Sequence, residues 1–205
     1  MHRSQVGELF YISHVANVGS IVRSGILSHN RAASVTHTKV DLDTVQEIRS
    51  HKRISPTRML HDHANLYFCG RNAMMYHVVR HNPIDAVCLI RVSADVLDLP
   101  DVVVMDGNAA RWESRPYDAA SGIAALDFDR IHAQYWTHPG DPVAHSQHMR
   151  EKQAEVLVPD IIDPRFITGF IVPTDAAATA IGTGAGRRPI AKAPYPFFPA
   201  SVWRR

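Results

Sequence analysis

The stretch Gln153-Ala154-Glu155-Val156-Leu157-Val158 has the composition of a buried β-strand, yet it carries a carboxylate. Side chains alternate across a strand, so Glu155 shares a face with Leu157 while Val156 points to the opposite face. A carboxylate is costly to bury without partners. Glu155 therefore lies either in water on an edge strand, or in a cleft where its charge stabilises a cationic transition state such as that of glycosidic cleavage.

Short apolar runs of the same kind recur along the chain and alternate with helical patterns. The expected strands cover residues 9–12, 66–69, 86–92, 102–105, 153–158 and 167–172, and three of the expected helices cover residues 14–24, 72–81 and 127–136. In the helix over 127–136, Ile131 and Tyr135 are expected to point inward. Short strands mixed with helices favour an α+β fold with a largely antiparallel sheet.

Local signals add the ends of two helices. Gly25 is a plausible stop for the first helix, because glycine adopts the left-handed conformation without strain. Thr44 and Glu47 have the spacing of a capping box, which predicts a further helix that carries Arg49.

The composition of the 205 residues fits one domain over 1–205, because 45% are hydrophobic and 20% are charged. The formal net charge is +2, which permits nucleic acid as a partner without requiring it. No stretch approaches the roughly 20 apolar residues of a membrane span, and no signal peptide is visible. Cys69 and Cys88 form no Cys-x-x-Cys motif, so we expect free thiols and a cytoplasmic location.

The C-terminal part of the chain has a biased composition. Residues 174–186 are rich in alanine and end in Gly-Thr-Gly-Ala-Gly, and residues 187–205 are basic and rich in proline. The glycines lack the strand before them and the acidic residue after them that a dinucleotide-binding loop requires. We therefore expect a flexible loop at 174–186 and a loosely held tail at 187–205.

Two histidine groups have the spacing of metal ligands. They are His61 with His63, and His77 with His81, which share one helix face. The spacing places no third ligand and His-Glu-x-x-His is absent, so we expect no metal. No Gly-x-Ser-x-Gly motif supports serine hydrolase chemistry.

Two arginines are candidates for anion binding. Arg49 is either a solvated helical residue or an anion clamp, since a guanidinium matches the geometry of a pyrophosphate. Arg71 precedes the helix over 72–81, where helix N-terminal N–H groups also suit a phosphate. The alternative for this region is a capped turn with Tyr67 and Phe68 in the core.

Several segments, taken in order, resemble the DarT family, which comprises DNA ADP-ribosyltransferase toxins of bacterial toxin–antitoxin systems. They are Phe10-Tyr11-Ile12-Ser13-His14, Gly25-Ile26-Leu27-Ser28-His29-Asn30, Leu60-His61-Asp62 with Leu66-Tyr67-Phe68, Arg71-Asn72-Ala73-Met74-Met75-Tyr76, Asp106-Gly107-Asn108-Ala109-Ala110, Leu126-Asp127 with Tyr135-Trp136, and Lys152-Gln153-Ala154-Glu155-Val156-Leu157-Val158. The similarity covers residues 9–172, so it includes most of the chain.

The resemblance implies an ADP-ribosyltransferase fold, with a split and mainly antiparallel β core, surrounding helices and a cleft for NAD+ as co-substrate. Gln153-x-Glu155 matches the Gln/Glu-x-Glu signature of such transferases, which makes Glu155 the catalytic glutamate. Arg49 corresponds to the active-site arginine. The residues that the resemblance places at NAD+ are Tyr11, Ser13, Gly25, Leu27, Asn30, Tyr67 and Arg71.

The implied acceptor is a nucleobase of single-stranded DNA, either thymine or guanine, because the reactive nitrogen is paired in a duplex. Aromatic and polar or basic side chains suit such a strand. The candidates are Tyr76, Asn108, Arg111, Arg115, Tyr135, Trp136 and Lys152. The implied partner is a macrodomain antitoxin of the DarG type that removes the modification.

Three other functions are compatible with the sequence. A transferase of the same fold could act on RNA or protein, a non-catalytic module could bind nucleic acid, and a hydrolase could use the histidines with a metal. A transferase and a binding module differ in NAD+ binding, and chelators inhibit only the metal hydrolase.

Overall fold

A computed structural model describes residues 3–40 and 42–199 of the chain. Within these residues the main sheet has eight strands in the order β12-β11-β6-β1-β5-β9-β7-β8. Its strands are β1 (Glu8–His14), β5 (His63–Tyr67), β6 (Val87–Ser93), β7 (Val103–Met105), β8 (Pro116–Asp118), β9 (Glu155–Pro159), β11 (Ile167–Val172) and β12 (Ile190–Lys192). The pairings are antiparallel except for the parallel pair of β11 and β12, so the mainly antiparallel core is confirmed.

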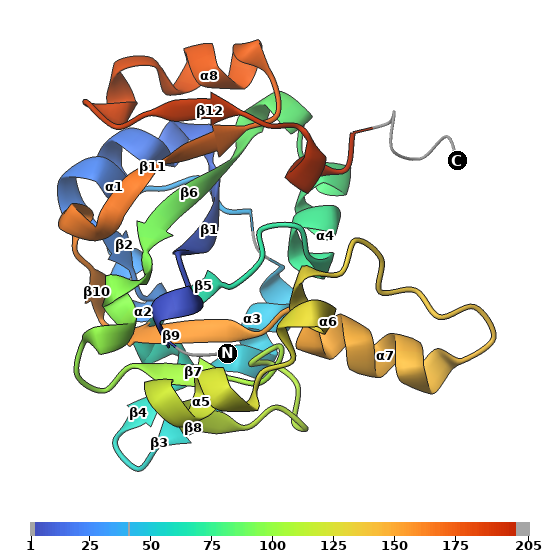
Figure 1. Cartoon of the computed structure of the whole chain (residues 1–205). Helices are drawn as coiled ribbons and strands as arrows, with labels where there is room; N and C mark the ends of the chain where they lie inside the picture. The colour runs from blue at the N-terminus through green and yellow to red at the C-terminus, as the bar shows by residue number, and fades with distance from the viewer. Residues whose placement is uncertain (1–2, 41, 200–205) are drawn as a thin grey trace.

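The sheet is split between β1 and β5. β1 pairs with β6 over seven positions, from Glu8–Ser93 to His14–Val87, whereas its register with β5 consists of the pair Phe10–Tyr67. Figure 1 shows the result: β1, β6 and β11 run steeply in one half, while β9 and β7 lie across the other half. The split core that the resemblance implied is therefore present.

Helices and two small two-stranded sheets surround the main sheet. The helices are α1 (Val18–Ser24), α2 (His29–Ala32), α3 (Asp43–Ser50), α4 (Ala73–His81), α5 (Ala119–Ala125), α6 (Phe128–His132), α7 (Pro142–Glu151) and α8 (Asp175–Ile181). The two-stranded sheets pair β2 (Ile26–Leu27) with β10 (Ile161–Ile162), and β3 (Arg53–Ser55) with β4 (Arg58–Met59). In Figure 1, α8 and β12 cover the upper end of the molecule and α5 lies against β7 and β8 at the lower end.

Apolar side chains from both halves of the sheet form the core. The largest buried cluster joins Leu9 of β1, Ile90 of β6 and Val156 of β9. A second cluster packs Met75 and Val78 of α4 against β6. Burial of such side chains supplies most of the stabilising free energy of a fold of this size.

The predicted ends of α1 and α4 are confirmed by their caps. Gly25 has a φ of 85° after α1, and its N–H donates to Ile21 O. Asn72 caps α4, because its side chain accepts a hydrogen bond from Met75 N. The two Cys residues are free thiols.

The expected capping box of α3 is wrong. The helix begins at Asp43, one residue before Thr44, and Leu42 at the N-cap makes no side-chain capping bond. Among its residues Arg49 is buried while Ile48 is exposed. A polar side chain of this helix therefore faces the interior of the molecule.

The helix expected over 127–136 is two structures. α6 ends at His132, so Ile131 is buried as expected, but Tyr135 is 59% exposed and does not point inward. α7 follows after a connecting segment. Asp141 caps it by accepting from Ala144 N, and a proline occupies the first turn.

The C-terminal expectations are also corrected. Residues 175–185 form α8 and a short 3-10 helix, Gly182–Ala185, in place of a flexible loop. β12 then pairs with β11, and Phe197 is buried in the cluster around α4. Alanine has the highest helix propensity, which explains why 174–186 is helical despite its low complexity. Residues 200–205 of the expected tail lie outside the described residues.

Candidate active site

Glu155 and Arg49 form a buried ion pair at the centre of the site. Glu155 begins β9, where it stands opposite Tyr67 of β5 and Met105 of β7, so its strand is internal. Arg49 comes from the last turn of α3. Its Nη1 donates to Glu155 Oε1 at 3.2 Å, and its Nη2 donates to Oε2 at 3.1 Å. Glu155 is 0% exposed and Arg49 is 7% exposed, which excludes the edge-strand interpretation of Glu155.

A backbone group completes the coordination of this carboxylate. Ala109 N donates to Glu155 Oε1 at 2.8 Å. Ala109 lies in the 106–115 loop after β7, and Asp106 anchors that loop by accepting hydrogen bonds from Arg115 N and Arg150 Nη1. Three donors thus satisfy the buried charge, which is the condition under which a protein tolerates it.

Two ionisable side chains beside the pair, Lys52 and Tyr67, have shifted pKa values. Burial lowers the pKa of Lys52, while the charge of Glu155 opposes that shift. The Lys52 ammonium donates to Arg111 O at 2.5 Å, which connects the end of α3 to the 106–115 loop. Burial, together with the charge of Glu155, raises the pKa of Tyr67, so its phenol stays neutral at physiological pH.

A cleft of about 520 Å³ adjoins the pair. Arg49 and Tyr67 line it, whereas Glu155 contributes no lining surface and is joined to the cleft through Arg49. Residues from both halves of the sheet meet there, including Tyr11 of β1 on one side and Tyr67 of β5 on the other. This volume lies within the range of small-molecule and cofactor sites and suits an extended dinucleotide.

Five of the seven residues expected at NAD+ line this cleft: Tyr11, Ser13, Gly25, Leu27 and Tyr67.

The structure does not bring the other two into the cleft. Asn30 is exposed and donates to Asp62 Oδ1 at 2.8 Å. Together with a hydrogen bond from Met59 N, the larger cause, this contact lowers the pKa of Asp62. Arg71 lines a second pocket instead.

Gly25 has a structural reason to be glycine. Its φ of 85° is in the region that L side chains rarely adopt. A Cβ at this position would also lie 2.4 Å from Ile162 O, because β10 passes close to the chain there. Gly25 therefore lets β2 start directly after α1 and form one wall of the cleft.

Histidines that the sequence indicated only as possible metal ligands line the cleft. His61 stacks on His29 with ring centroids 4.0 Å apart, and its Nε2 lies 3.0 Å from Gln46 Oε1. His63 Nδ1 lies 2.9 Å from Met59 O, and burial lowers the pKa of His63. The signal for these residues was a run of polar side chains directly before a strand. Within residues 3–40 and 42–199, no three or more His, Cys, Asp or Glu side chains are grouped so that they could hold a metal ion.

The candidates for strand binding separate into groups. Asn108 lines the cleft and donates to Gln153 Oε1 at 3.3 Å, so it belongs with the ion pair. Arg111 and Arg115 lie in the adjoining loop, where Arg111 pairs with Glu113 and Arg115 is exposed.

The expectation that Lys152 contacts a DNA strand is wrong. Lys152 is 1% exposed, and its ammonium donates to Ile131 O at 2.6 Å and to Cys69 Sγ at 3.4 Å. Burial lowers the pKa of Lys152. The side chain therefore ties α6 to the end of α7 and is not available to a phosphate.

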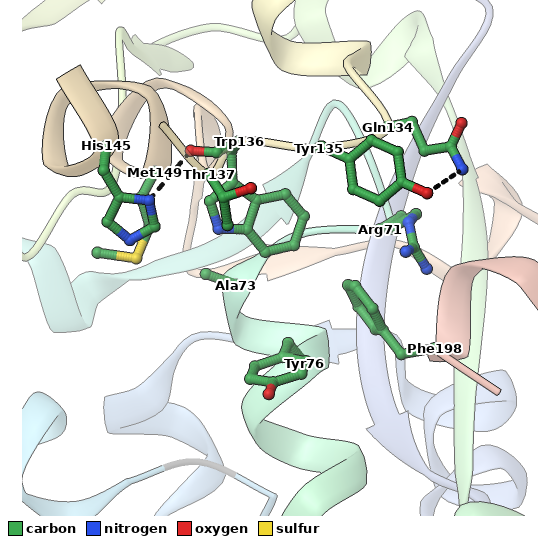
Figure 2. A pocket seen from close by; sticks show the side chains of 10 residues that line it. All are labelled: Arg71, Ala73, Tyr76, Gln134, Tyr135, Trp136, Thr137, His145, Met149 and Phe198. Carbon is green, nitrogen blue, oxygen red and sulfur yellow. Dashed lines mark hydrogen bonds between the residues drawn. The ribbon is translucent and has the colours of Figure 1, made fainter. Parts of the chain in front are cut away.

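Tyr76, Tyr135 and Trp136 lie together in the second pocket, which has a volume of about 290 Å³. Figure 2 shows their rings around the pocket, with Arg71 beside them. Ala73 and Met149 line both this pocket and the cleft, so the two cavities adjoin.

In the part of the chain that the structure covers, no helix has the length and apolar character needed to cross a membrane.

Comparison with known sequences identifies relatives. A family model described as "ssDNA thymidine ADP-ribosyltransferase, DarT" matches residues 10–199. A DNA ADP-ribosyl transferase–DNA ADP-ribosyl glycohydrolase fusion protein of Thermosipho africanus is 30% identical over 201 residues, which cover 93% of this chain and 49% of the relative. A DNA ADP-ribosyl transferase of Thermus sp. is 28% identical over 73% of each chain. The chain thus spans about half the length of the fusion protein.

Solved structures share the fold. Thermosipho africanus DarTG in complex with ADP-ribose superposes with a TM-score of 0.81 at 28% identity, and the match covers 94% of this chain and 51% of that one. Thermus sp. 2.9 DarT in complex with ADP-ribosylated ssDNA superposes with a TM-score of 0.79 at 22% identity, over 95% and 97% of the two chains.

Proposed function

This chain belongs to the DarT family of ssDNA thymidine ADP-ribosyltransferases, and we propose that it transfers ADP-ribose from NAD+ to thymine in single-stranded DNA. The observation that carries this proposal is the bidentate Arg49–Glu155 pair beside a cleft of dinucleotide size. Fixed charges of both signs at one cleft suit a substrate with an anionic pyrophosphate and a ribose that becomes cationic during reaction.

The reaction exchanges one glycosidic bond for another. The bond between nicotinamide and ribose C1″ breaks, and nicotinamide leaves with the bonding electrons. The ribose gains oxocarbenium character, which a carboxylate stabilises. A ring nitrogen of the base forms the new bond to C1″ and loses its proton. In this scheme the charge of Glu155, buried beside the cleft behind Arg49, opposes the developing charge of the ribose without forming a covalent intermediate.

Arg49 has two tasks in this scheme. It orients the carboxylate of Glu155 through two hydrogen bonds from its guanidinium. Because Arg49 also lines the cleft, its guanidinium can contact the pyrophosphate or the acceptor base.

The rest of the cleft binds NAD+ by shape and by neutral donors. Tyr11, Ser13, Gly25 and Leu27 form the wall contributed by β1 and β2, and the neutral phenol of Tyr67 forms the opposite wall. Their positions along one cavity support the assignment that the family resemblance implied.

The acceptor is single-stranded for a physical reason. The ring nitrogen of thymine that carries a proton is hydrogen-bonded to the opposite base in a duplex, so an enzyme must act on an unpaired or extruded base. The family description favours thymine over guanine as the target.

The cellular role follows from the reaction. A modified base blocks pairing, so the protein acts as a toxin on bacterial DNA in the cytoplasm. Its partner is a macrodomain antitoxin that removes the ADP-ribose. A relative that joins a DNA ADP-ribosyl transferase to a DNA ADP-ribosyl glycohydrolase in one chain supports this pairing.

The test is mass spectrometry of a mixed-sequence single-stranded oligonucleotide after incubation with NAD+. We expect an added ADP-ribosyl unit, located on thymine by fragmentation. Parallel incubations contain duplex DNA, RNA of the same sequence, or a protein mixture. Modification of RNA or protein in preference to single-stranded DNA would replace the proposed substrate, and absence of any NAD+ binding would favour a non-catalytic module.

A further inference from the structure

The second pocket has the properties of a site for one planar ring. Tyr76 and Ala73 of α4, Tyr135 and Trp136 of the segment before α7, and Phe198 near the C-terminus line it. In Figure 2 the aromatic rings and the Arg71 guanidinium surround a common space. Its volume of about 290 Å³ is too small for a dinucleotide and suits a single base or nucleoside.

The rings hold one another in a fixed arrangement. Phe198 packs edge-on against Tyr76 and Trp136, with centroid distances of 5.3 and 5.8 Å. The guanidinium carbon of Arg71 lies 3.8 Å from the centroid of the Phe198 ring and 4.6 Å from that of Tyr195. Such edge-on and cation–π contacts favour a defined geometry over a loose apolar patch.

Arg71 carries the second observation that indicates a ligand. The residue is 6% exposed, and its Nη1 donates to Tyr195 O at 2.7 Å. Its Nε is buried and has no hydrogen-bond partner among the described residues. A buried donor without an acceptor is unfavourable, so a ligand that supplies an acceptor near it is favoured.

We propose that this pocket binds one base of the DNA strand, next to the base that receives ADP-ribose. The base stacks against the aromatic side chains, and a carbonyl oxygen or ring nitrogen on its edge accepts a hydrogen bond from the Arg71 guanidinium, which lines the pocket. Because Ala73 and Met149 line both cavities, a base held here belongs to a nucleotide close to the one in the cleft. This inference rests on the proposed function and adds to it a determinant of sequence preference.

The composition of the pocket distinguishes a base from other ligands. A phosphate favours several cationic donors, whereas the walls here are largely aromatic and apolar and hold one guanidinium, together with the polar side chains of Gln134, Thr137 and His145. The base of NAD+ itself is a less suitable occupant, because the adjoining cleft of about 520 Å³ already accommodates a dinucleotide.

The proposal also gives the C-terminal segment a function. Phe198 has a φ of 52°, a conformation that a bulky residue adopts only when its surroundings impose it. The segment is held nearby by β12 and by Phe197, which is buried against α4. Residues 190–197 thus hold Phe198 in the wall of the pocket.

The experiment uses a set of single-stranded oligonucleotides with one thymine, in which each neighbouring nucleotide in turn is replaced by an abasic residue. Mass spectrometry gives kcat/KM for each. For the unaltered chain we expect one flanking position at which base removal lowers kcat/KM by roughly 5- to 150-fold, the range that corresponds to the stacking of one base on an aromatic side chain. Trp136→Ala and Phe198→Leu should lower kcat/KM on the intact oligonucleotide and lose the sensitivity to that abasic position.

Two controls separate the pocket from general effects. Val143→Ala truncates an exposed apolar side chain outside both cavities and should keep the full sensitivity. The rise in Tm that NAD+ causes should be the same in Trp136→Ala as in the unaltered chain. Trp136→Phe retains a ring and should retain most of the sensitivity, which keeps the test valid if Trp136→Ala folds poorly.

The outcomes are distinct. If the pocket variants stay as sensitive to the abasic position as the unaltered chain, the proposal is overturned. If Trp136→Ala loses the rise in Tm that NAD+ causes, the pocket belongs to NAD+, and the proposal of a DNA base site is also overturned. If the unaltered chain modifies no oligonucleotide, the proposed function fails. In that case the affinity for oligonucleotides, measured by fluorescence anisotropy without NAD+, tests the pocket alone. If the pocket holds a base, Trp136→Ala should bind intact and abasic strands with equal affinity.

Discussion

The molecule buries two arginines in different ways. Arg49 meets a carboxylate in a bidentate pair, and the pair is complete within the chain. Arg71 lies among aromatic rings, with one donor bonded to Tyr195 O and its Nε without an acceptor. The difference shows how burial can serve two ends: in the proposed function Arg49 fixes the catalytic carboxylate, whereas in the proposed base site Arg71 donates to the ligand.

The largest expected effect comes from breaking the complete pair. Arg49→Ala leaves Glu155 as a buried charge that has lost two of its donors, which should lower the free energy of unfolding by about 3–5 kcal/mol. Urea denaturation measures this change. Arg115→Ala, at an exposed arginine, should change stability by less than about 0.5 kcal/mol. The double variant Arg49→Met with Glu155→Gln should recover part of the loss, because no charge is then left unpaired.

Neutralising the acid of the same pair tests catalysis. Glu155→Gln keeps the shape of the side chain but removes the charge that opposes the ribose cation, so kcat for DNA modification should fall at least about a hundredfold. Glu47→Gln, at an exposed glutamate on α3, is the matched control and should keep full activity. Activity near that of the unaltered chain in Glu155→Gln would refute the assigned role of the carboxylate.

Arg71 should contribute much less to stability than Arg49. Arg71→Met removes one hydrogen bond to a backbone carbonyl, and it also removes an unsatisfied donor, so we expect a loss of about 1 kcal/mol in the free energy of unfolding. Its affinity for single-stranded oligonucleotides should fall in the same variant. A destabilisation as large as that of Arg49→Ala would contradict the contrast between the two sites.

The smallest expected effect is the pH dependence of stability that comes from the buried side chain of His63. Burial lowers the pKa of His63 in the folded chain below the usual value of 6.5, so the unfolded chain binds more protons as the pH falls through that value. Stability should therefore decrease below about pH 6.5, in a window separate from that of Asp62, whose lowered pKa acts near pH 4 and below. Tm measured from pH 5 to pH 8 tests this, and His63→Gln should flatten the slope.

The sequence predicted most of what depends on neighbouring residues. The caps of α1 and α4 are readable because Gly25 and Asn72 satisfy backbone groups a few residues away. The buried strand around Glu155 was visible in its apolar neighbours. The family resemblance supplied the seven residues expected at NAD+, and five of them line one cleft.

Contacts between distant segments could not be read in this way. The Arg49–Glu155 pair joins residues 106 positions apart, and spacing alone left Arg49 as either solvated or functional. Lys152 has the sequence context of a surface cation, but Ile131 O and Cys69 Sγ bind it in the interior. Arg71 enters its pocket because Tyr195 and Phe198 return to it from the C-terminal segment.

The single register pair between β1 and β5 has a mechanical consequence. The two halves of the sheet are each internally hydrogen-bonded, and they join at Phe10–Tyr67, beside residues that line the cleft. A small rotation of one half against the other can change the width of the cleft while leaving the ladders of each half intact. A dinucleotide that contacts both halves opposes such rotation, so amide hydrogens around this seam should exchange with deuterium more slowly when NAD+ is bound.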